Sequence, residues 1–234
     1  MCRHLAWFGA SRSVSALVLE PEHGLLRQSW APRYQQHGTL NADGWGVGFH
    51  PDPRPGRPQD PVRWRSDRPL WSDVSFASVA PHLTSGRVLA AVRSATVGMP
   101  ADASAAAPFL HDGWLVSHNG VVDKAAVGPR IDAESACDSA LLASRVVGDG
   151  VDRLGRTVVA LATADPAARL NLLLLSRDRL LAVTWGDTHF VRADAEGVLL
   201  ASEPDATSGW HPVPDRHLVD VSARGATLRP LEQP

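Results

Sequence analysis

The spacing of apolar residues predicts strands at both ends of the chain. Residues 3–9 have the pattern of a strand that begins almost at the N-terminus, and residues 87–94 form a continuous apolar run typical of a buried strand. Beyond residue 168 the apolar period switches to two, as in half-buried strands. The remaining strands are expected near 62–65, 113–118, 169–176, 179–185, 188–193, 197–201, 217–221 and 226–229.

Helical spacing is concentrated in the middle of the chain, with one exception near its start. Ser13 is an expected N-cap for a helix from Val14 to about Leu26, although Pro21 favours an earlier end. Further helices are expected over 72–84, 133–147 and 151–163.

A glycine-rich segment leads into a proline-rich one. Residues 41–49 pass from turn-forming residues straight into strand-like alternation, and they lack the Lys and the following helix of a phosphate loop. Residues 50–61 contain five prolines. We expect them to form a long exposed loop within a hairpin-like pair of strands, not a linker between domains.

These elements favour an α+β fold. Many antiparallel-looking strands with grouped helices predict sheets packed on each other with helices outside. A doubly wound parallel sheet would need strands and helices in strict alternation, which the pattern lacks. A chain of 234 residues can bury a substantial core, and no repeat or linker divides it, so we expect one domain over 1–234.

Charge and composition exclude several classes of protein. The 23 basic residues nearly balance the 25 acidic ones, so no net field would attract nucleic acid or an anionic membrane. The chain has neither a signal-peptide pattern nor a membrane-spanning apolar run, which predicts a cytoplasmic protein with reduced thiols. Two cysteines build no disulfide framework, and the histidines lack metal-ligand spacing, so no metal or other cofactor is expected.

Cys2 is the most informative residue. Removal of Met1 would give Cys2 both a thiol and a free α-amine, with ordinary pKa values of about 8.5 and 7.7–8.0. One residue would then supply a nucleophile and its base. The alternative is that Cys2 is only a small residue with no function, and a retained Met1 would disable this chemistry.

Asn119 and Gly120 follow His118 at the end of a predicted strand. An Asn amide and a Gly backbone N–H are suitable donors for the oxyanion of an acyl-transfer intermediate. Asn-Gly is also a common turn dipeptide, so a plain turn is the alternative interpretation.

Arg93 and Thr96 lie at the end of the apolar strand 87–94. A guanidinium there can bind a carboxylate through two hydrogen bonds, with the Thr96 hydroxyl as a second donor. In a protein rich in arginine, a surface role for Arg93 remains the alternative.

Asp138 lies in the stretch 133–147, next to Cys137. Its carboxylate could accept hydrogen bonds from a substrate ammonium group, or it could simply offset the helix dipole. We expect Cys137 to be a small buried side chain and not a second nucleophile.

Taken in order, these motifs resemble those of the class II glutamine amidotransferases, which are N-terminal-nucleophile hydrolases. The resemblance covers nearly the whole chain and includes the segment 201–204, for which it suggests no catalytic role. It implies a four-layer αββα sandwich with Cys2 at the mouth of a pocket between the sheets. By the family pattern Cys2 attacks a γ-glutamyl amide, Asn119 and Gly120 hold the oxyanion, Arg93 and Thr96 bind the α-carboxylate, and Asp138 binds the α-ammonium.

Within this family, the segments 1–5, 25–33 and 41–49 are most similar to the actinobacterial amidohydrolases of ergothioneine biosynthesis. The resemblance implies glutamate release from a small molecule, γ-glutamyl-hercynylcysteine sulfoxide. Two alternatives stay open: a glutaminase subunit that supplies ammonia to a separate synthase, and a non-catalytic γ-glutamyl-binding protein.

The leaving group of that substrate carries a trimethylammonium group, which aromatic rings can hold. The chain has eight Trp residues, and packing in the core is the alternative role for each. Those that lie near a predicted loop or motif are Trp7, Trp30, Trp45, Trp71 and Trp210.

Overall fold

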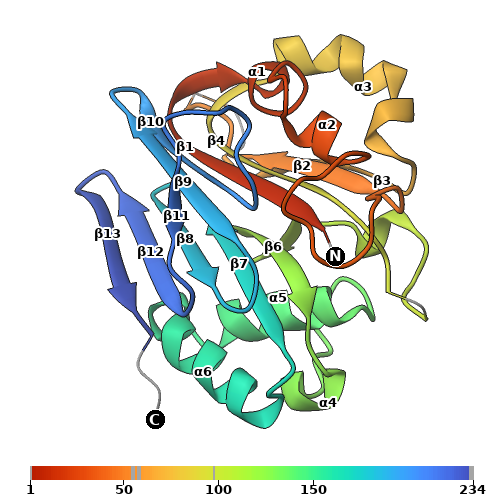
Figure 1. Cartoon of the computed structure of the whole chain (residues 1–234), viewed down its shortest axis with the longest axis vertical. Coiled ribbons are helices and arrows are strands. Elements are labelled where there is room, and N and C mark those ends of the chain that lie inside the picture. Colours follow the sequence, from red (N-terminus) through yellow and green to blue (C-terminus); the bar gives the residue numbers. More distant parts are fainter. Residues whose placement is uncertain (1, 54–55, 57–58, 97, 232–234) are drawn as a thin grey trace.

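The computed structural model describes residues 2–53, 56, 59–96 and 98–231, and within them two antiparallel sheets lie face to face (Figure 1). The first sheet has the order β11-β9-β10-β1-β4-β2-β3 and the second β13-β12-β8-β7-β6-β5. The first contains β1 (Arg3–Ser13), β2 (Trp45–Phe49), β3 (Val62–Ser66), β4 (Thr84–Val92), β9 (His189–Asp194), β10 (Gly197–Ala201) and β11 (His211–Val213). The second contains β5 (Phe109–His111), β6 (Trp114–Val121), β7 (Arg169–Leu175), β8 (Arg179–Thr184), β12 (His217–Ser222) and β13 (Gly225–Pro230).

Helices cover the outer face of each sheet (Figure 1). The first sheet carries α1 (Val14–Val18), α2 (Leu25–Gln28) and α3 (Val74–Val79), with the 3₁₀ turns η1 (Leu70–Ser72) and η2 (Ala80–His82) beside α3. The second carries α4 (Lys124–Val127), α5 (Asp138–Gly148) and α6 (Leu154–Ala164), preceded by η4 (Val151–Arg153). Another 3₁₀ turn, η3 (Ala103–Ala105), leads into β5.

Three apolar clusters separate these four layers. One packs the first sheet against its helices, one packs the second sheet against α4–α6, and one lies between the sheets. Ala6 and Phe8 of β1 belong to the cluster between the sheets, whereas Leu5 and Trp7 belong to the helix-covered cluster. Since successive side chains of a strand point to opposite faces, β1 is buried on both sides over its first half. The four-layer αββα prediction is confirmed.

Most predicted strands occur within a few residues of their expected bounds, but three helix predictions are wrong in extent. The helix expected from Val14 to about Leu26 is two short helices, α1 and α2. Ser13 does cap α1, its hydroxyl accepting a hydrogen bond from the backbone N–H of Ala16 at 3.1 Å. The break contains Pro21, whose carbonyl accepts from the N–H of Gly24 in a turn, as expected of a residue that cannot donate to a helix.

The helix expected over 133–147 begins only at Asp138. Glu134 is held outside it, because its carboxylate accepts hydrogen bonds from Arg63 at 2.6 Å and Arg65 at 3.2 Å, both on β3. This tertiary contact overrides the helical periodicity of the segment. Over 72–84 the helix is likewise shorter than expected, because Pro81 lies in η2 and β4 already starts at Thr84.

The Asn119-Gly120 dipeptide is not a turn, because β6 continues through it to Val121. The short elements β5, β11 and α4 were not predicted, since three or four residues carry no periodic signal. The proline-rich loop 50–61 does connect the paired strands β2 and β3. Residues 54–55 and 57–58 of that loop lie outside the described part of the chain.

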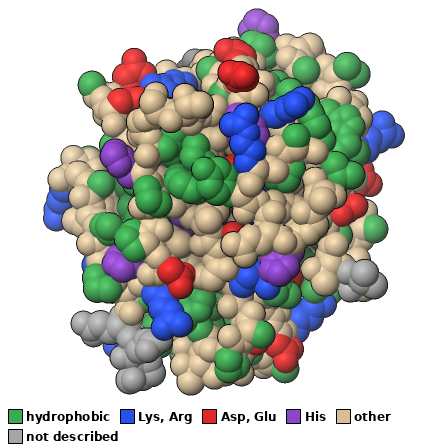
Figure 2. All heavy atoms as spheres, viewed as in Figure 1, with side chains coloured by type: hydrophobic (Ala, Val, Ile, Leu, Met, Phe, Trp, Pro, Cys, Tyr) green, Lys and Arg blue, Asp and Glu red, His purple; other side chains and the backbone are tan. Residues whose placement is uncertain are grey.

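The surface carries mixed charges. On the face drawn in Figure 2, basic and acidic side chains are dispersed and do not gather into one patch. In the part of the chain that the structure describes, no helix is both long enough and apolar enough to cross a membrane.

Two histidines form a buried hydrogen-bonded pair that bridges the sheets. His4 on β1 and His189 on β9 approach within 2.7 Å through their Nε2 atoms. The other ring nitrogens reach into the second sheet, to Ser117 Oγ at 3.0 Å and Thr184 Oγ1 at 3.2 Å. Burial lowers the pKa of both imidazoles, that of His189 to about 3, so both rings are neutral near pH 7.

This pair predicts that acid destabilises the fold. Below about pH 6.5 these histidines protonate in the unfolded chain but stay neutral in the folded one, so each removes up to about 1.4 kcal/mol of unfolding free energy per pH unit. For His189 the loss continues down to about pH 3. Urea unfolding between about pH 7 and pH 4 measures this slope. His189→Gln should reduce the slope of unfolding free energy against pH by the contribution of one histidine, whereas the exposed His37→Gln should not. Equal slopes in both variants would refute the prediction.

Candidate active site

Cys2 is placed where the two sheets meet. It immediately precedes β1, the central strand of the first sheet. Its backbone N–H donates to Asn119 Oδ1 on β6 of the second sheet at 3.0 Å. Met1, whose removal the N-terminal-nucleophile chemistry requires, lies outside the described residues. The nitrogen that would become the α-amine is therefore held by a fixed acceptor.

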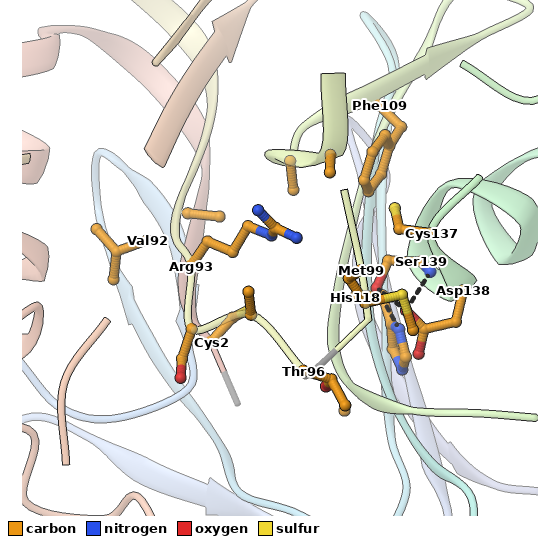
Figure 3. Close-up of a pocket in the computed structure, with 16 residues that line it drawn as sticks. Cys2, Val92, Arg93, Thr96, Met99, Phe109, His118, Cys137, Asp138 and Ser139 are labelled. Carbon is orange, nitrogen blue, oxygen red and sulfur yellow. Dashed lines mark hydrogen bonds between the residues drawn. The ribbon is translucent and has the colours of Figure 1, made fainter. Parts of the chain in front are cut away.

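A pocket opens beside Cys2 and includes about 500 Å³ of empty space up to its solvent-open mouth. Figure 3 shows its walls, which come from the end of β4, the segment 93–107, β6 and the start of α5. Five of the six residues that the sequence singled out line it: Cys2, Arg93, Thr96, Gly120 and Asp138. The sixth, Asn119, contacts Cys2 without lining this pocket.

Arg93 supplies the positive charge of the pocket. Two backbone carbonyls hold its side chain. Nη2 donates to the Pro100 carbonyl at 2.8 Å, and Nη1 donates to the Asp43 carbonyl at 3.2 Å. The residue is only 7% exposed, and among the described residues it forms no ion pair. In Figure 3 the guanidinium points across the pocket toward α5. A buried guanidinium held only by neutral carbonyls is well suited to an incoming carboxylate.

Asp138 supplies the negative charge on the opposite wall. It is the first residue of α5, and its carboxylate accepts from the backbone N–H of Ser139 at 2.8 Å and of Val122 at 3.2 Å. Asp138 is 6% exposed. The helix N-terminus stabilises this charge, as the simpler interpretation of the sequence proposed, and the carboxylate still faces the pocket.

His118 and Ser139 support the wall around Asp138. His118 Nε2 lies 2.8 Å from the carbonyl oxygen of Arg169, and its Nδ1 lies 2.9 Å from Ser139 Oγ. Burial lowers the pKa of His118, which favours the neutral ring. A neutral ring beside that carbonyl carries its proton on Nε2, so the Ser139 hydroxyl donates to Nδ1. The sequence motif contained His118 but suggested no role for it.

Gly120 allows a close approach of two strands. A Cβ at this position would lie 1.9 Å from the Arg169 carbonyl oxygen, so no side chain fits there without moving β7. Thr96, by contrast, is exposed and lies on the loop that lines the pocket beyond Arg93.

Apolar side chains form part of the same pocket wall. They belong to Met99, Ala105, Ala107, Phe109 and Cys137. Cys137 is 3% exposed, as expected for a packed side chain, and burial raises the pKa of its thiol. Such a wall suits the methylene groups of a small substrate whose charged groups meet Arg93 and Asp138.

None of the tryptophans lines this pocket. Trp7 and Trp45 are each 1% exposed and belong to the helix-covered core of the first sheet. For these two residues packing is the role that the structure gives.

Two buried charged residues near Cys2 had no assigned role in the sequence. Arg3 Nε donates to the Cys2 carbonyl at 2.7 Å. Glu203, within the segment 201–204, accepts from the backbone N–H of Tyr34 at 2.8 Å and lies 3.0 Å from His23 Nε2. Both side chains are fully buried. No group of three or more potential metal-ligating side chains is found among the described residues.

Comparisons with known proteins agree with this geometry. No protein-family model matches the chain. The chain is 56% identical over 234 residues to the γ-glutamyl-hercynylcysteine sulfoxide hydrolase of Mycobacterium tuberculosis, covering 100% of this chain and 98% of the relative. It is 55% identical over 232 residues to the protein of that name from Mycolicibacterium smegmatis, covering 99% of this chain and 100% of that one.

Solved structures share the fold at lower identity. A class II glutamine amidotransferase domain protein from Silicibacter pomeroyi superposes with a TM-score of 0.69 at 21% identity, over 99% of this chain and 100% of that one. The glutamine phosphoribosylpyrophosphate amidotransferase of Bacillus subtilis superposes with a TM-score of 0.70 at 12% identity, over 100% of this chain and 50% of that one. These likenesses confirm the N-terminal-nucleophile hydrolase fold. By its full-length identity to the two mycobacterial proteins, the chain belongs to the γ-glutamyl-hercynylcysteine sulfoxide hydrolase family of class II glutamine amidotransferase-like enzymes.

Proposed function

We propose that this protein is a cysteine-nucleophile amidohydrolase that releases glutamate from γ-glutamyl-hercynylcysteine sulfoxide in ergothioneine biosynthesis. The observation that carries the choice of substrate is the 56% identity over the whole chain to a hydrolase of that name. The pocket supports the glutamyl part of the proposal, because a buried cation, a buried anion and apolar side chains line it together.

We assign the recognition of glutamate to Arg93 and Asp138. Arg93 binds the α-carboxylate, with Thr96 as an additional donor, and Asp138 accepts hydrogen bonds from the α-ammonium. Each substrate charge would then meet an opposite charge in a mostly desolvated site, where loss of one partner costs about 2–5 kcal/mol. The γ-carbonyl would lie toward Cys2 at the edge of the pocket.

We assign the chemical step to Cys2 after removal of Met1. The thiol proton passes to the α-amine, and the sulfur attacks the γ-carbonyl carbon. The resulting oxyanion is held by Asn119 Nδ2 and the backbone N–H of Gly120. Collapse of the tetrahedral intermediate breaks the C–N bond. The protonated α-amine of Cys2 returns its proton to the leaving nitrogen, and a thioester remains. Water then hydrolyses the thioester, which releases glutamate and restores the thiol.

We propose that residues 1–234 act as one domain on a small-molecule substrate in the cytoplasm. The cluster between the sheets supports one domain, because both sheets contribute to the same buried core. The near balance of 23 basic and 25 acidic residues supports a small-molecule partner over a nucleic acid or a membrane surface.

The first test compares substrates. Purified protein should release glutamate from γ-glutamyl-hercynylcysteine sulfoxide with a kcat/KM at least about tenfold above that for glutamine, since a tenfold preference needs only about 1.4 kcal/mol of leaving-group binding. A coupled glutamate assay measures both reactions. Faster glutamine hydrolysis would favour the glutaminase subunit, and binding of the sulfoxide without turnover would favour the non-catalytic protein.

The second test addresses the nucleophile. Intact-mass measurement should show a chain without Met1, and Cys2→Ala should lower kcat by at least about 10³-fold while the thermal unfolding curve keeps its shape. A stoichiometric amount of iodoacetamide should label Cys2 and spare Cys137, which is 3% exposed. Turnover by Cys2→Ala at the wild-type rate would exclude the mechanism.

The third test separates the two charged contacts with shortened substrates. A glutaryl amide lacks the α-ammonium, and a 4-aminobutyryl amide lacks the α-carboxylate. Asp138→Asn should raise KM for the γ-glutamyl amide and lose the preference for γ-glutamyl over glutaryl, whereas Arg93→Ala should lose the preference over 4-aminobutyryl, each by about 30-fold or more. Arg12→Ala, which removes a partly buried partner of the exposed Glu196, serves as the control. Equal losses toward both shortened amides in one variant would contradict the assignment.

A further inference from the structure

Asp187 connects the two residues that the proposed mechanism places at the reacting carbonyl. Its Oδ2 lies 3.4 Å from Arg3 Nη2 and 3.5 Å from Asn119 Nδ2. The side chain is only 1% exposed. One carboxylate oxygen therefore faces both the arginine that holds Cys2 and the amide that contacts it. Both contacts are long for hydrogen bonds, so much of the interaction is electrostatic.

Arg3 depends on Asp187 for its closest ion pair. Its Nε donates to the Cys2 carbonyl at 2.7 Å, while Nη1 has no hydrogen-bond partner among the described residues and lies 3.9 Å from Glu203. Burial lowers the pKa of Arg3, and the charges of Asp187 and Glu203 oppose this shift. Asp187 therefore lies closer than Glu203 to the guanidinium that binds the Cys2 carbonyl, and it orients that guanidinium.

Asp187 also selects one orientation of the Asn119 amide. Asn119 Oδ1 accepts from the Cys2 nitrogen at 3.0 Å, which leaves Nδ2 toward the carboxylate. Rotation of the amide by 180° would bring Oδ1 against Asp187 and Nδ2 against the Cys2 nitrogen. Both contacts would then be repulsive, because an ionised carboxylate only accepts hydrogen bonds and the Cys2 nitrogen only donates in this contact.

The turn that carries Asp187 is well braced. Asp187 Oδ1 accepts from the Thr188 N–H at 2.8 Å, and the Thr188 hydroxyl donates to the Ser202 carbonyl at 2.7 Å. Gly186 has a φ of +80° and donates its N–H to Asp215 Oδ1 at 2.8 Å. The carboxylate is therefore fixed by the backbone between β8 and β9 and does not depend on substrate for its place.

We propose that Asp187 is a positioning residue that sets the orientation of Cys2, through Arg3, and of the Asn119 amide, so that nucleophile and oxyanion donor face the same carbonyl. This inference rests on the proposed cysteine mechanism. It does not require Asp187 to touch substrate. Since Arg93 and Asp138 bind glutamate on their own, loss of Asp187 should affect the chemical step and leave binding of the glutamyl group intact.

The test uses Asp187→Asn, which keeps the size and an acceptor oxygen but removes the charge, and Asp187→Ala. We expect kcat for γ-glutamyl-hercynylcysteine sulfoxide to fall about 10- to 100-fold in Asp187→Asn and further in Asp187→Ala, with KM changed less than about threefold. Asp215→Asn alters a carboxylate that braces the same turn but contacts neither Arg3 nor Asn119. It should keep kcat within about twofold of the wild type.

A second measurement separates failure of this inference from failure of the substrate assignment. 6-Diazo-5-oxonorleucine presents a glutamyl group and an electrophile without an amine leaving group. Its maximal rate of alkylating Cys2, followed by intact mass, should fall about tenfold in Asp187→Asn at an unchanged half-saturating concentration. Wild-type rates in folded Asp187→Asn, or an equal loss in Asp215→Asn, would overturn the positioning role. This readout stays valid even if the sulfoxide is not hydrolysed.

Discussion

The hydrogen bond from the Cys2 nitrogen to Asn119 Oδ1 is the contact on which the site depends. It joins the central strand of one sheet to β6 of the other, across 117 positions of sequence. Neither sheet alone contains a site, because β1 brings Cys2, β4 leads to Arg93, and β6 brings Asn119 and Gly120. The apolar cluster between the sheets therefore stabilises the fold and also sets the distance between the proposed nucleophile and its oxyanion donor.

The buried charged side chains around this contact lie next to side chains of opposite charge. Arg3, Asp187 and Glu203 are buried close to one another, so each charge has an opposite charge nearby. Burying such groups costs free energy that their mutual attraction offsets only in part. In return, the buried ion pairs hold each side chain in one orientation. Arg93 differs, because its described partners are neutral carbonyls. A substrate carboxylate would complete its pairing, so this wall of the pocket favours an anion.

The sequence predicted the elements and site residues that short local motifs specify. It did not predict features that depend on contacts between residues far apart in the chain. Most strands and five of the pocket residues could be predicted from local patterns, whereas the four-layer arrangement followed from the family resemblance. The helix at 133–147 was misjudged because Glu134 pairs with arginines on β3, which periodicity does not register. Asp187 belongs to none of the motifs that the sequence offered. Its position opposite Asn119, 68 residues away, depends on how the second sheet packs against the first.

The pocket fits the proposed recognition of a glutamyl group better than that of a leaving group. Among the described residues, its walls contain one arginine, one aspartate, and polar and apolar side chains, but no tryptophan. The segment 33–40 lies along its edge: a Cβ at Gly38 would be 3.7 Å from Ser94 Oγ, and Glu203 holds the backbone of Arg33 and Tyr34. The residues proposed to bind glutamate and those that could meet the other half of the substrate thus come from different segments. Relatives of this fold can therefore share the glutamyl pocket and still differ in the amide that they cut.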